Sequence, residues 1–296
     1  MNCNQCPRNC NKERKEDVVS SYGYCQVSVL LKVARAALHF WEEPCISGEE
    51  GSGTVFFSGC NLRCVYCQNV EIAAGVRGKE ISVEHLSEIF LELQEKGANN
   101  INLVTPSHYY PQIKAALLLV KEKLHIPGIA NTSSYDSIEA LKEMEGFIDI
   151  YLADYKYADS IMAKKYSHAA DYPQVAAEAL SEMFRQVGEP EFDERGIMKK
   201  GMIIRHLLLP GCSDDSKNVL KYLYKTFGDS VFISIMNQYT PLPHVEKYPE
   251  INRRVTDEEY EEIVDYAIEL GIENGFVQEG ETAEESFIPA FDGEGV

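Results

Sequence analysis

The chain has 296 residues, of which 45% are hydrophobic, and a formal net charge of −19. Its length suits one large domain with an appendage, and its acidic balance argues against a nucleic-acid partner because no basic excess exists to displace counterions. No apolar run reaches membrane-spanning length, and the N-terminal stretch MNCNQCPRNCNKERK lacks the apolar core of a secretory signal. Nine cysteines without an export signal indicate metal ligation in a reducing compartment. We therefore expect a cytoplasmic protein that does not bind membranes.

Four cysteines near the N-terminus form a candidate metal site. Cys3, Cys6 and Cys10 have the spacing C-x2-C-x3-C, and Cys25 follows after a polar stretch. Four thiolates suit either a closed [4Fe–4S] cluster or an all-thiolate zinc site, and free thiols on a disordered tail are the remaining alternative. We predict a cysteine-rich metal-binding extension over residues 1–52, because a segment with so little apolar material is typically held together by a metal.

The second part of this extension has a helical pattern. Apolar residues recur at helical spacing between Val27 and Trp41, which predicts an amphipathic helix that packs against the main domain. Cys45 follows it, and we expect a buried structural thiol there rather than a ligand.

Three further cysteines follow the first predicted strand. The stretch GCNLRCVYCQN places Cys60, Cys64 and Cys67 at the spacing C-x3-C-x2-C. Three thiolates can hold three irons of a [4Fe–4S] cluster, and the fourth iron then keeps an open position that can bind and activate a ligand. The alternatives are a structural zinc, which usually presents paired C-x2-C knuckles, and a chance cluster of cysteines.

From residue 53 to residue 285, strand patterns alternate with amphipathic helix patterns, and residues 286–296 form a C-terminal tail. The predicted strands are Thr54–Ser58, Asn100–Val104, Ile126–Asn131, Ile148–Ala153, Met202–Leu209, Val231–Met236 and Gly275–Gln278. The predicted helices are Val83–Lys96, Pro111–Lys123, Ser137–Glu145, Ser160–Tyr166, Tyr172–Val187, Ser216–Thr226 and Asp257–Leu270, and Gly188–Lys200 is expected to be a surface loop. Such βα repeats predict an α/β fold with a parallel sheet and right-handed crossovers.

Small polar residues follow two of these strands. Thr105 and Ser107 come after the second strand, and Asn131 and Ser133 come at the end of the third. Parallel α/β folds build their sites at this edge of the sheet, so these residues are candidates for cofactor contacts. They serve equally well as caps for the helices that follow.

Charged residues end the next two strands. Asp154 and Lys156 lie two positions apart, so both side chains should point to the same side of an extended segment. A cleft is the more plausible place for them than the core, because burying an unpaired charge is costly. Arg205 interrupts an apolar strand, and its planar fork suits a carboxylate. His206 should alternate to the other face as a packed or surface histidine.

With Gly59 before its first cysteine and Tyr66 before its last, the cysteine loop resembles the C-x3-C-x-aromatic-C motif of the radical S-adenosylmethionine (SAM) superfamily. The Asp-x-Lys strand end and the Arg…Pro-Gly segment are similar to the glycyl-radical-enzyme-activating branch of that superfamily. The CNQCPRNC opening and the VTPSH, NTSSY, ADYKY and RHLLLPG segments are more similar still to a branch of iron–sulfur proteins described as pyruvate formate-lyase-activating-enzyme-like.

The resemblance implies a partial parallel (β/α)6-type barrel in which Cys60, Cys64 and Cys67 hold a [4Fe–4S] cluster whose open iron binds SAM. Reductive cleavage of SAM would then give a 5′-deoxyadenosyl radical that abstracts a hydrogen atom. The residues that would contact SAM by this resemblance are Tyr66, Asn69, Thr105, Ser107, Asn131, Ser133, Asp154, Lys156 and Arg205. The Gly-Gly-Glu motif that many members carry after the second strand is absent, so Thr105 and Ser107 are the polar groups available there.

The resemblance also implies partners. An electron donor such as flavodoxin or ferredoxin would reduce the cluster, and the substrate would be a glycine of a partner enzyme. Two alternatives stay open: a radical SAM enzyme that acts on another substrate with an auxiliary cluster at the N-terminal cysteines, and a non-catalytic iron–sulfur or zinc protein used for electron transfer or as a scaffold.

Overall fold

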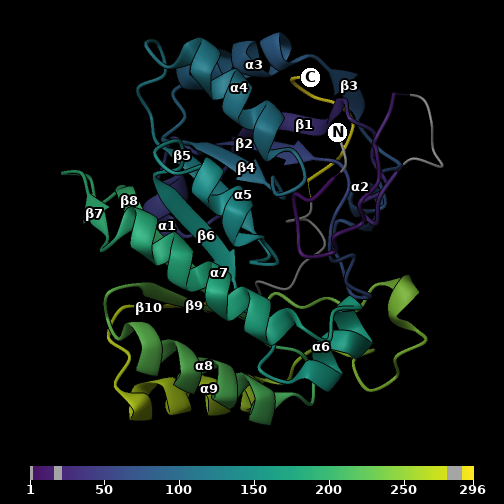
Figure 1. Cartoon of the computed structure of the whole chain (residues 1–296). Helices are drawn as coiled ribbons and strands as arrows, with labels where there is room; N and C mark the ends of the chain where they lie inside the picture. The colour runs from purple at the N-terminus through teal and green to yellow at the C-terminus, as the bar shows by residue number, and fades with distance from the viewer. Residues whose placement is uncertain (1–2, 17–21, 279–288) are drawn as a thin grey trace.

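The structure is a computed structural model that describes residues 3–16, 22–278 and 289–296 (Figure 1). Its strands are β1 (Leu31–His39), β2 (Ser52–Phe57), β3 (Lys79–Ile81), β4 (Ile101–Val104), β5 (Gly128–Thr132), β6 (Ile150–Asp154), β7 (Glu191–Phe192), β8 (Met198–Leu207), β9 (Phe232–Met236) and β10 (Gly275–Val277). Its helices are α1 (Pro44–Ser47), α2 (Val70–Ala73), α3 (Val83–Glu95), α4 (Tyr110–Val120), α5 (Ile138–Glu143), α6 (Ser160–Ser167), α7 (Tyr172–Val187), α8 (Ser213–Phe227), the 3-10 turn η2 (Pro243–Val245) and α9 (Asp257–Leu270).

The strands form a mainly parallel sheet in the order β10-β9-β8-β6-β5-β4-β2-β1-β3, with β7 paired to β8. Every neighbouring pair from β2 to β10 in this order is parallel, whereas β1 and β3 are antiparallel additions at the edge. Helices such as α3, α4, α7, α8 and α9 cover the outside of the curved sheet (Figure 1). The predicted α/β partial barrel is confirmed, and its strand carboxyl ends meet at one edge.

The helix ends follow local signals that are present in the sequence. In α9, the Thr256 hydroxyl accepts a hydrogen bond from the Glu259 N–H while the Glu259 side chain accepts one from the Thr256 N–H, and Gly271 ends the helix in the left-handed conformation. In α7, a proline lies in the first turn and Gly188, with a positive φ of 66°, follows the last turn. The bounds predicted for both helices, Tyr172–Val187 and Asp257–Leu270, are those observed.

The helix predicted between Val27 and Trp41 is wrong, because this segment forms strand β1. Leu31, Val33 and Ala36 pack into the main core. An irregularity in the pairing with β2 between Val33 and Arg35 breaks the two-residue alternation. The core-facing residues Val33 and Ala36 are therefore three positions apart, as core-facing residues of a helix would be. The β-bulge thus gives this strand an apolar spacing that imitates a helix.

Two short strands, β3 and β7, form where no strand was predicted. Part of the predicted surface loop Gly188–Lys200 forms β7 and the start of β8, and β3 went unpredicted. β1 pairs with β2, so the extension predicted for residues 1–52 contributes to the sheet. Its boundary stays a prediction, and the predicted boundary at residue 285 lies outside the described residues. Residues 289–296 run beside β1, where the Ala36 N–H donates to the Glu294 carbonyl at 2.9 Å.

Buried His206 makes the stability of the fold depend on pH. Its ring nitrogens lie 2.9 Å from the Tyr155 carbonyl oxygen and 2.8 Å from the Ser216 hydroxyl. Burial lowers the pKa of His206 from its ordinary value of 6.5 to about 4. A depressed pKa stabilises the folded state above pH 6.5, and this contribution, up to about 3 kcal/mol, is lost as the pH falls toward 4.

We therefore expect the free energy of unfolding, measured with urea between pH 8 and pH 4, to fall below about pH 6.5. Replacing His206 with Gln removes the titrating group and should flatten this part of the curve, even though the variant is less stable at pH 8. An unchanged slope in His206→Gln would contradict the assignment.

Candidate active site

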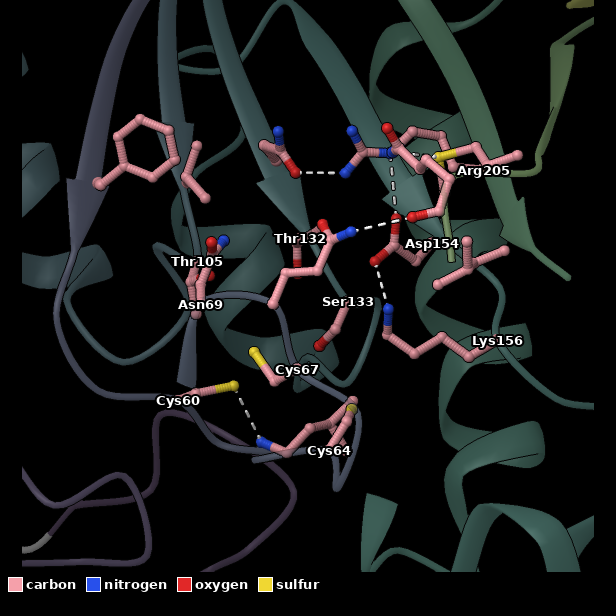
Figure 2. A pocket seen from close by; sticks show the side chains of 18 of the residues that line it. Cys60, Cys64, Cys67, Asn69, Thr105, Thr132, Ser133, Asp154, Lys156 and Arg205 are labelled. Carbon is pink, nitrogen blue, oxygen red and sulfur yellow. Dashed lines mark hydrogen bonds and ion pairs between the residues drawn. The ribbon is translucent and has the colours of Figure 1, made fainter. Parts of the chain in front are cut away.

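A cleft of about 270 Å³ opens at the carboxyl ends of the parallel strands (Figure 2). This volume lies near the lower end of the usual range for small-molecule sites. The predicted site residues that line the cleft are Cys60, Cys64, Tyr66, Cys67, Asn69, Thr105, Asn131, Ser133, Asp154, Lys156 and Arg205. They come from the loop after β2 and from the ends of β4, β5, β6 and β8, which the sheet order brings together.

The cysteine loop leaves β2 and presents three sulfur atoms to one end of the cleft (Figure 2). Gly59 turns the chain with φ of 90°, and a Cβ atom there would lie only 2.7 Å from the Cys25 carbonyl oxygen. The loop therefore requires glycine at this position. The Leu62 N–H points to Cys60 Sγ at 3.4 Å, and the Ser167 hydroxyl at the end of α6 donates to Cys64 Sγ at 2.9 Å.

The chemistry of these three sulfur atoms suits a metal cluster. Burial, together with the charges of Cys60 and Cys64, raises the pKa of Cys67 to about 12, so three thiolates here need a cation to neutralise them. Thiolates select iron–sulfur clusters, zinc or copper(I). Three thiolates at the spacing C-x3-C-x2-C can hold three irons of a [4Fe–4S] cluster.

Farther along the cleft lies a set of side chains that we call the ion-pair group: Glu42, Asn131, Asp154, Lys156 and Arg205. Figure 2 labels Asp154, Lys156 and Arg205 of this group. Lys156 Nζ lies 2.6 Å from one carboxylate oxygen of Asp154, and Arg205 Nε lies 3.1 Å from the other. Asp154 and Arg205 are directly opposite in the pairing of β6 with β8. The prediction that Asp154 and Lys156 point to the same side agrees with this geometry.

The ion-pair group keeps Asp154 ionised. Burial alone would raise the pKa of Asp154, but the charges of Lys156 and Arg205 together bring it below its ordinary value. The same contacts raise the pKa of Lys156 against the effect of burial, mainly through Asp154. The cleft therefore offers fixed positive and negative charges a short distance from the cysteine loop, as a zwitterionic ligand requires.

Glu42 is a member of the ion-pair group that the sequence analysis missed. One of its carboxylate oxygens accepts hydrogen bonds from the side-chain amides of Asn102 at 2.9 Å and Asn131 at 3.2 Å, and the other accepts from Arg205 Nη1 at 3.1 Å. The segment before α1 carries it there, and α1 is fixed to the sheet because Asn100 donates to the Ile46 carbonyl at 2.8 Å. In the sequence, the only local sign of this role is that two successive glutamates, Glu42 and Glu43, precede Pro44.

Of three further residues predicted to contact the cofactor, two line the cleft and one does not. Tyr66 lies in the cleft wall and its hydroxyl accepts a hydrogen bond of 2.7 Å from Tyr157. Thr105 lines the cleft with a left-handed backbone, φ 59°. Ser107 is buried outside the cleft lining, 3.4 Å from the Thr132 hydroxyl, so the structure does not bring it to the site.

The cysteine motif and the charged strand ends thus occupy one cleft at the carboxyl edge of a partial barrel. The sequence profile of the Radical SAM superfamily matches residues 54–223, more than half of the chain. The chain belongs to the radical SAM superfamily. Membership implies a [4Fe–4S] cluster and SAM as cofactors.

The chain is also similar to a curated relative and to solved structures. The uncharacterised protein MJ0674 of Methanocaldococcus jannaschii is 27% identical over 278 residues, which cover 90% of this chain and 74% of that protein. Streptococcus suis SuiB bound to precursor peptide SuiA matches with a TM-score of 0.52 and 13% identity, over 75% of this chain and 47% of SuiB. A radical SAM methyltransferase from Sphaerobacter thermophilus gives a TM-score of 0.52 at 13% identity, over 77% of this chain and 66% of the enzyme.

At 13% identity the likeness to the two structures shows the fold alone, and this chain spans about half the length of SuiB. The narrower resemblance to activating enzymes of glycyl-radical enzymes stays a prediction. Within the described residues, no helix of this radical SAM chain has the length and apolar character needed to cross a bilayer.

The N-terminal cysteine segment lies against the radical SAM loop, since a Cβ atom at Gly59 would lie 2.7 Å from the Cys25 carbonyl oxygen. Burial, together with the charges of Cys25, Cys3 and Cys10, raises the pKa of Cys6 to about 12. Cys6 and Cys25 are buried, whereas Cys3 and Cys10 are partly exposed. Cys45, by contrast, lies in α1 and belongs to a buried apolar cluster with Ile46 and Ile129, and Cys212 precedes α8 outside the cleft.

Proposed function

We propose that this chain is a radical SAM enzyme in which Cys60, Cys64 and Cys67 hold the [4Fe–4S] cluster and the ion-pair group holds SAM beside it. The observation that supports this most directly is that one cleft joins the three cysteines to Asp154, Lys156 and Arg205. When bound together, the reduced cluster and SAM supply a 5′-deoxyadenosyl radical that abstracts a hydrogen atom from a substrate.

The protein's own residues bind and orient SAM in this proposal. Lys156 and Arg205 present cationic donors to the SAM carboxylate, and Asp154 accepts from its amino group. Asn131, Ser133 and Thr105 offer neutral polar groups for the ribose. Tyr66 and Asn69 contribute to the wall beside the adenine. Ser107 is buried outside the cleft lining and makes no contact with SAM.

Formation of 5′-deoxyadenosine tests the proposal. We expect anaerobically reconstituted, reduced protein to convert SAM into 5′-deoxyadenosine and methionine, detected by liquid chromatography with mass spectrometry. The Cys60→Ala and Cys67→Ala variants should form none. A wild-type protein that contains the cluster and forms no 5′-deoxyadenosine would refute the enzymatic function and favour an electron-transfer or scaffold role.

We also propose a polypeptide as the substrate. SuiB is bound to a precursor peptide in its solved structure, and in this chain Trp41 lines the cleft with 65% of its surface exposed, next to the half-exposed Phe40. Exposed aromatic rings are favourable contacts for peptides.

The narrower prediction, a glycine of a partner enzyme, requires a glycyl radical on that partner, which electron paramagnetic resonance (EPR) spectroscopy would detect. Hydrogen transfer from another peptide position would instead favour the alternative substrate class.

Ser167 should tune the reduction potential of the cluster. Its hydroxyl donates a hydrogen bond of 2.9 Å to Cys64 Sγ, and hydrogen bonds to cluster sulfur atoms stabilise the reduced form. We expect Ser167→Ala to make the midpoint potential more negative in a redox titration followed by EPR. Ser181→Ala is the matched control, because the Ser181 hydroxyl donates to the Ala177 carbonyl on α7 instead. Equal potentials in both variants would show that Ser167 has no such role.

A further inference from the structure

The N-terminal cysteines form a site of their own. The Tyr24 N–H points to Cys10 Sγ at 3.3 Å, and Gly23 packs against the same sulfur atom. The Cys3 N–H donates to the Lys12 carbonyl at 2.8 Å, and the Asn9 N–H donates to the Cys6 carbonyl at 3.1 Å, which folds the segment around its cysteines. Four thiolates suit either a closed [4Fe–4S] cluster or an all-thiolate zinc site, and of the two only the cluster can carry electrons.

Arg8 fixes this segment to the radical SAM loop. Its guanidinium donates to the carbonyl oxygens of Asn61 at 2.8 Å, His168 at 2.6 Å and Ser167 at 3.2 Å. Asn61 lies next to Cys60 in the sequence, and Ser167 bonds directly to Cys64. The arginine therefore connects the CNQCPRNC segment to neighbours of two proposed cluster ligands.

A second, independent contact joins the two sites. The Cys25 carbonyl oxygen lies 2.7 Å from the position that a Cβ atom would take at Gly59, which directly precedes Cys60. The Tyr24 hydroxyl donates to the Leu62 carbonyl at 3.1 Å, and the Tyr24 ring lies under Arg8 at 4.0 Å. The backbone that carries Cys25 thus touches the backbone that carries Cys60.

We propose that Cys3, Cys6, Cys10 and Cys25 hold a second iron–sulfur cluster through which electrons reach the site at Cys60, Cys64 and Cys67. Four cysteine ligands leave no open iron for substrate, which suits electron transfer. Partly exposed Cys3 and Cys10 face the solvent, where a one-electron carrier protein such as flavodoxin or ferredoxin can approach. One electron passes from the reduced carrier through the second site to the cleft, and the carrier leaves oxidised by one electron. This inference rests on the proposed function.

Two variants and two reductants test the proposal. Cys6→Ala with Cys10→Ala removes two ligands of the second site, and Arg8→Ala keeps all its ligands but removes the connection to Asn61 and Ser167. We expect the double variant to lose about half of the iron, from about eight to about four atoms per chain, and Arg8→Ala to keep it. With dithionite, a small reductant that reaches the cleft directly, both variants should form 5′-deoxyadenosine like the wild type. With reduced flavodoxin both should lose most of the rate.

A spectroscopic readout adds to this assay. EPR spectra of the fully reduced wild type should show broadening from two neighbouring clusters, and Arg8→Ala should reduce it. Zinc in place of iron at the N-terminal site, equal losses with both reductants, or no loss with flavodoxin would overturn the proposal. Failure of the proposed function is distinguishable, because the wild type would then form no 5′-deoxyadenosine even with dithionite.

Discussion

Replacing Cys64 with alanine should remove the cluster of the cleft and abolish SAM cleavage. Cys64 is the middle cysteine of the loop, and its sulfur atom faces the cleft beside those of Cys60 and Cys67 (Figure 2). With one of three ligands missing, too few thiolates remain to hold a site-differentiated cluster. We expect 5′-deoxyadenosine formation to fall to background and the iron content to fall by about four atoms per chain.

The matched control for this prediction is Cys212→Ala. Cys212 is also partly buried, but it lies before α8 and does not line the cleft. Its replacement should leave iron content and SAM cleavage unchanged. If Cys64→Ala kept full activity, or if both variants lost iron equally, the assignment of the three loop cysteines would be wrong.

Replacing Arg205 with leucine should destabilise the fold and prevent SAM binding. The Arg205 side chain is 13% exposed and pairs with Glu42 and Asp154, which are 10% and 15% exposed. Without the guanidinium, two carboxylates stay buried with fewer partners, and removing one member of such a buried pair typically costs about 3–5 kcal/mol. The free energy of unfolding, measured with urea, should fall by this order.

Two further variants separate this effect from the loss of a surface charge. Arg195→Leu removes an arginine that is 51% exposed and pairs with Asp193 and Glu50 at the surface, so stability should change little. Adding Glu42→Gln to Arg205→Leu removes one of the uncompensated charges and should restore part of the stability, as coupled residues do in a double-mutant cycle. An additive loss in the double variant would contradict a direct Glu42–Arg205 interaction.

Local sequence signals were sufficient for much of the fold. The cap of α9 at Thr256 and the glycine that ends α7 are decided within a few residues, and both helices were predicted with their observed bounds. The cysteine loop after β2 was predicted for the same reason, because its spacing lies in one short stretch. β1 was not, because the irregular pairing near Val33 depends on its partner strand and gives the segment a helical pattern.

Contacts between distant segments account for what the sequence did not reveal. Glu42 reaches Arg205 across 163 positions, and Ser167 reaches Cys64 across 103. Which polar residues meet in the cleft depends on the strand order, and that order is not visible in any single segment. Ser107 shows the converse: it follows a strand as the site residues do, but it is buried beside Thr132, which lines the cleft, and does not line the cleft itself.

The measurement that tests the central claim most directly is the EPR spectrum of the reduced protein before and after addition of SAM. If the ion-pair group holds SAM against the cluster at Cys60, Cys64 and Cys67, the spectrum should change on addition, and SAM labelled with ¹⁵N in its amino group should show coupling to the cluster. Asp154→Asn should weaken this response while the iron content stays the same. A cluster-loaded wild type whose spectrum is unchanged at saturating SAM would contradict the assignment.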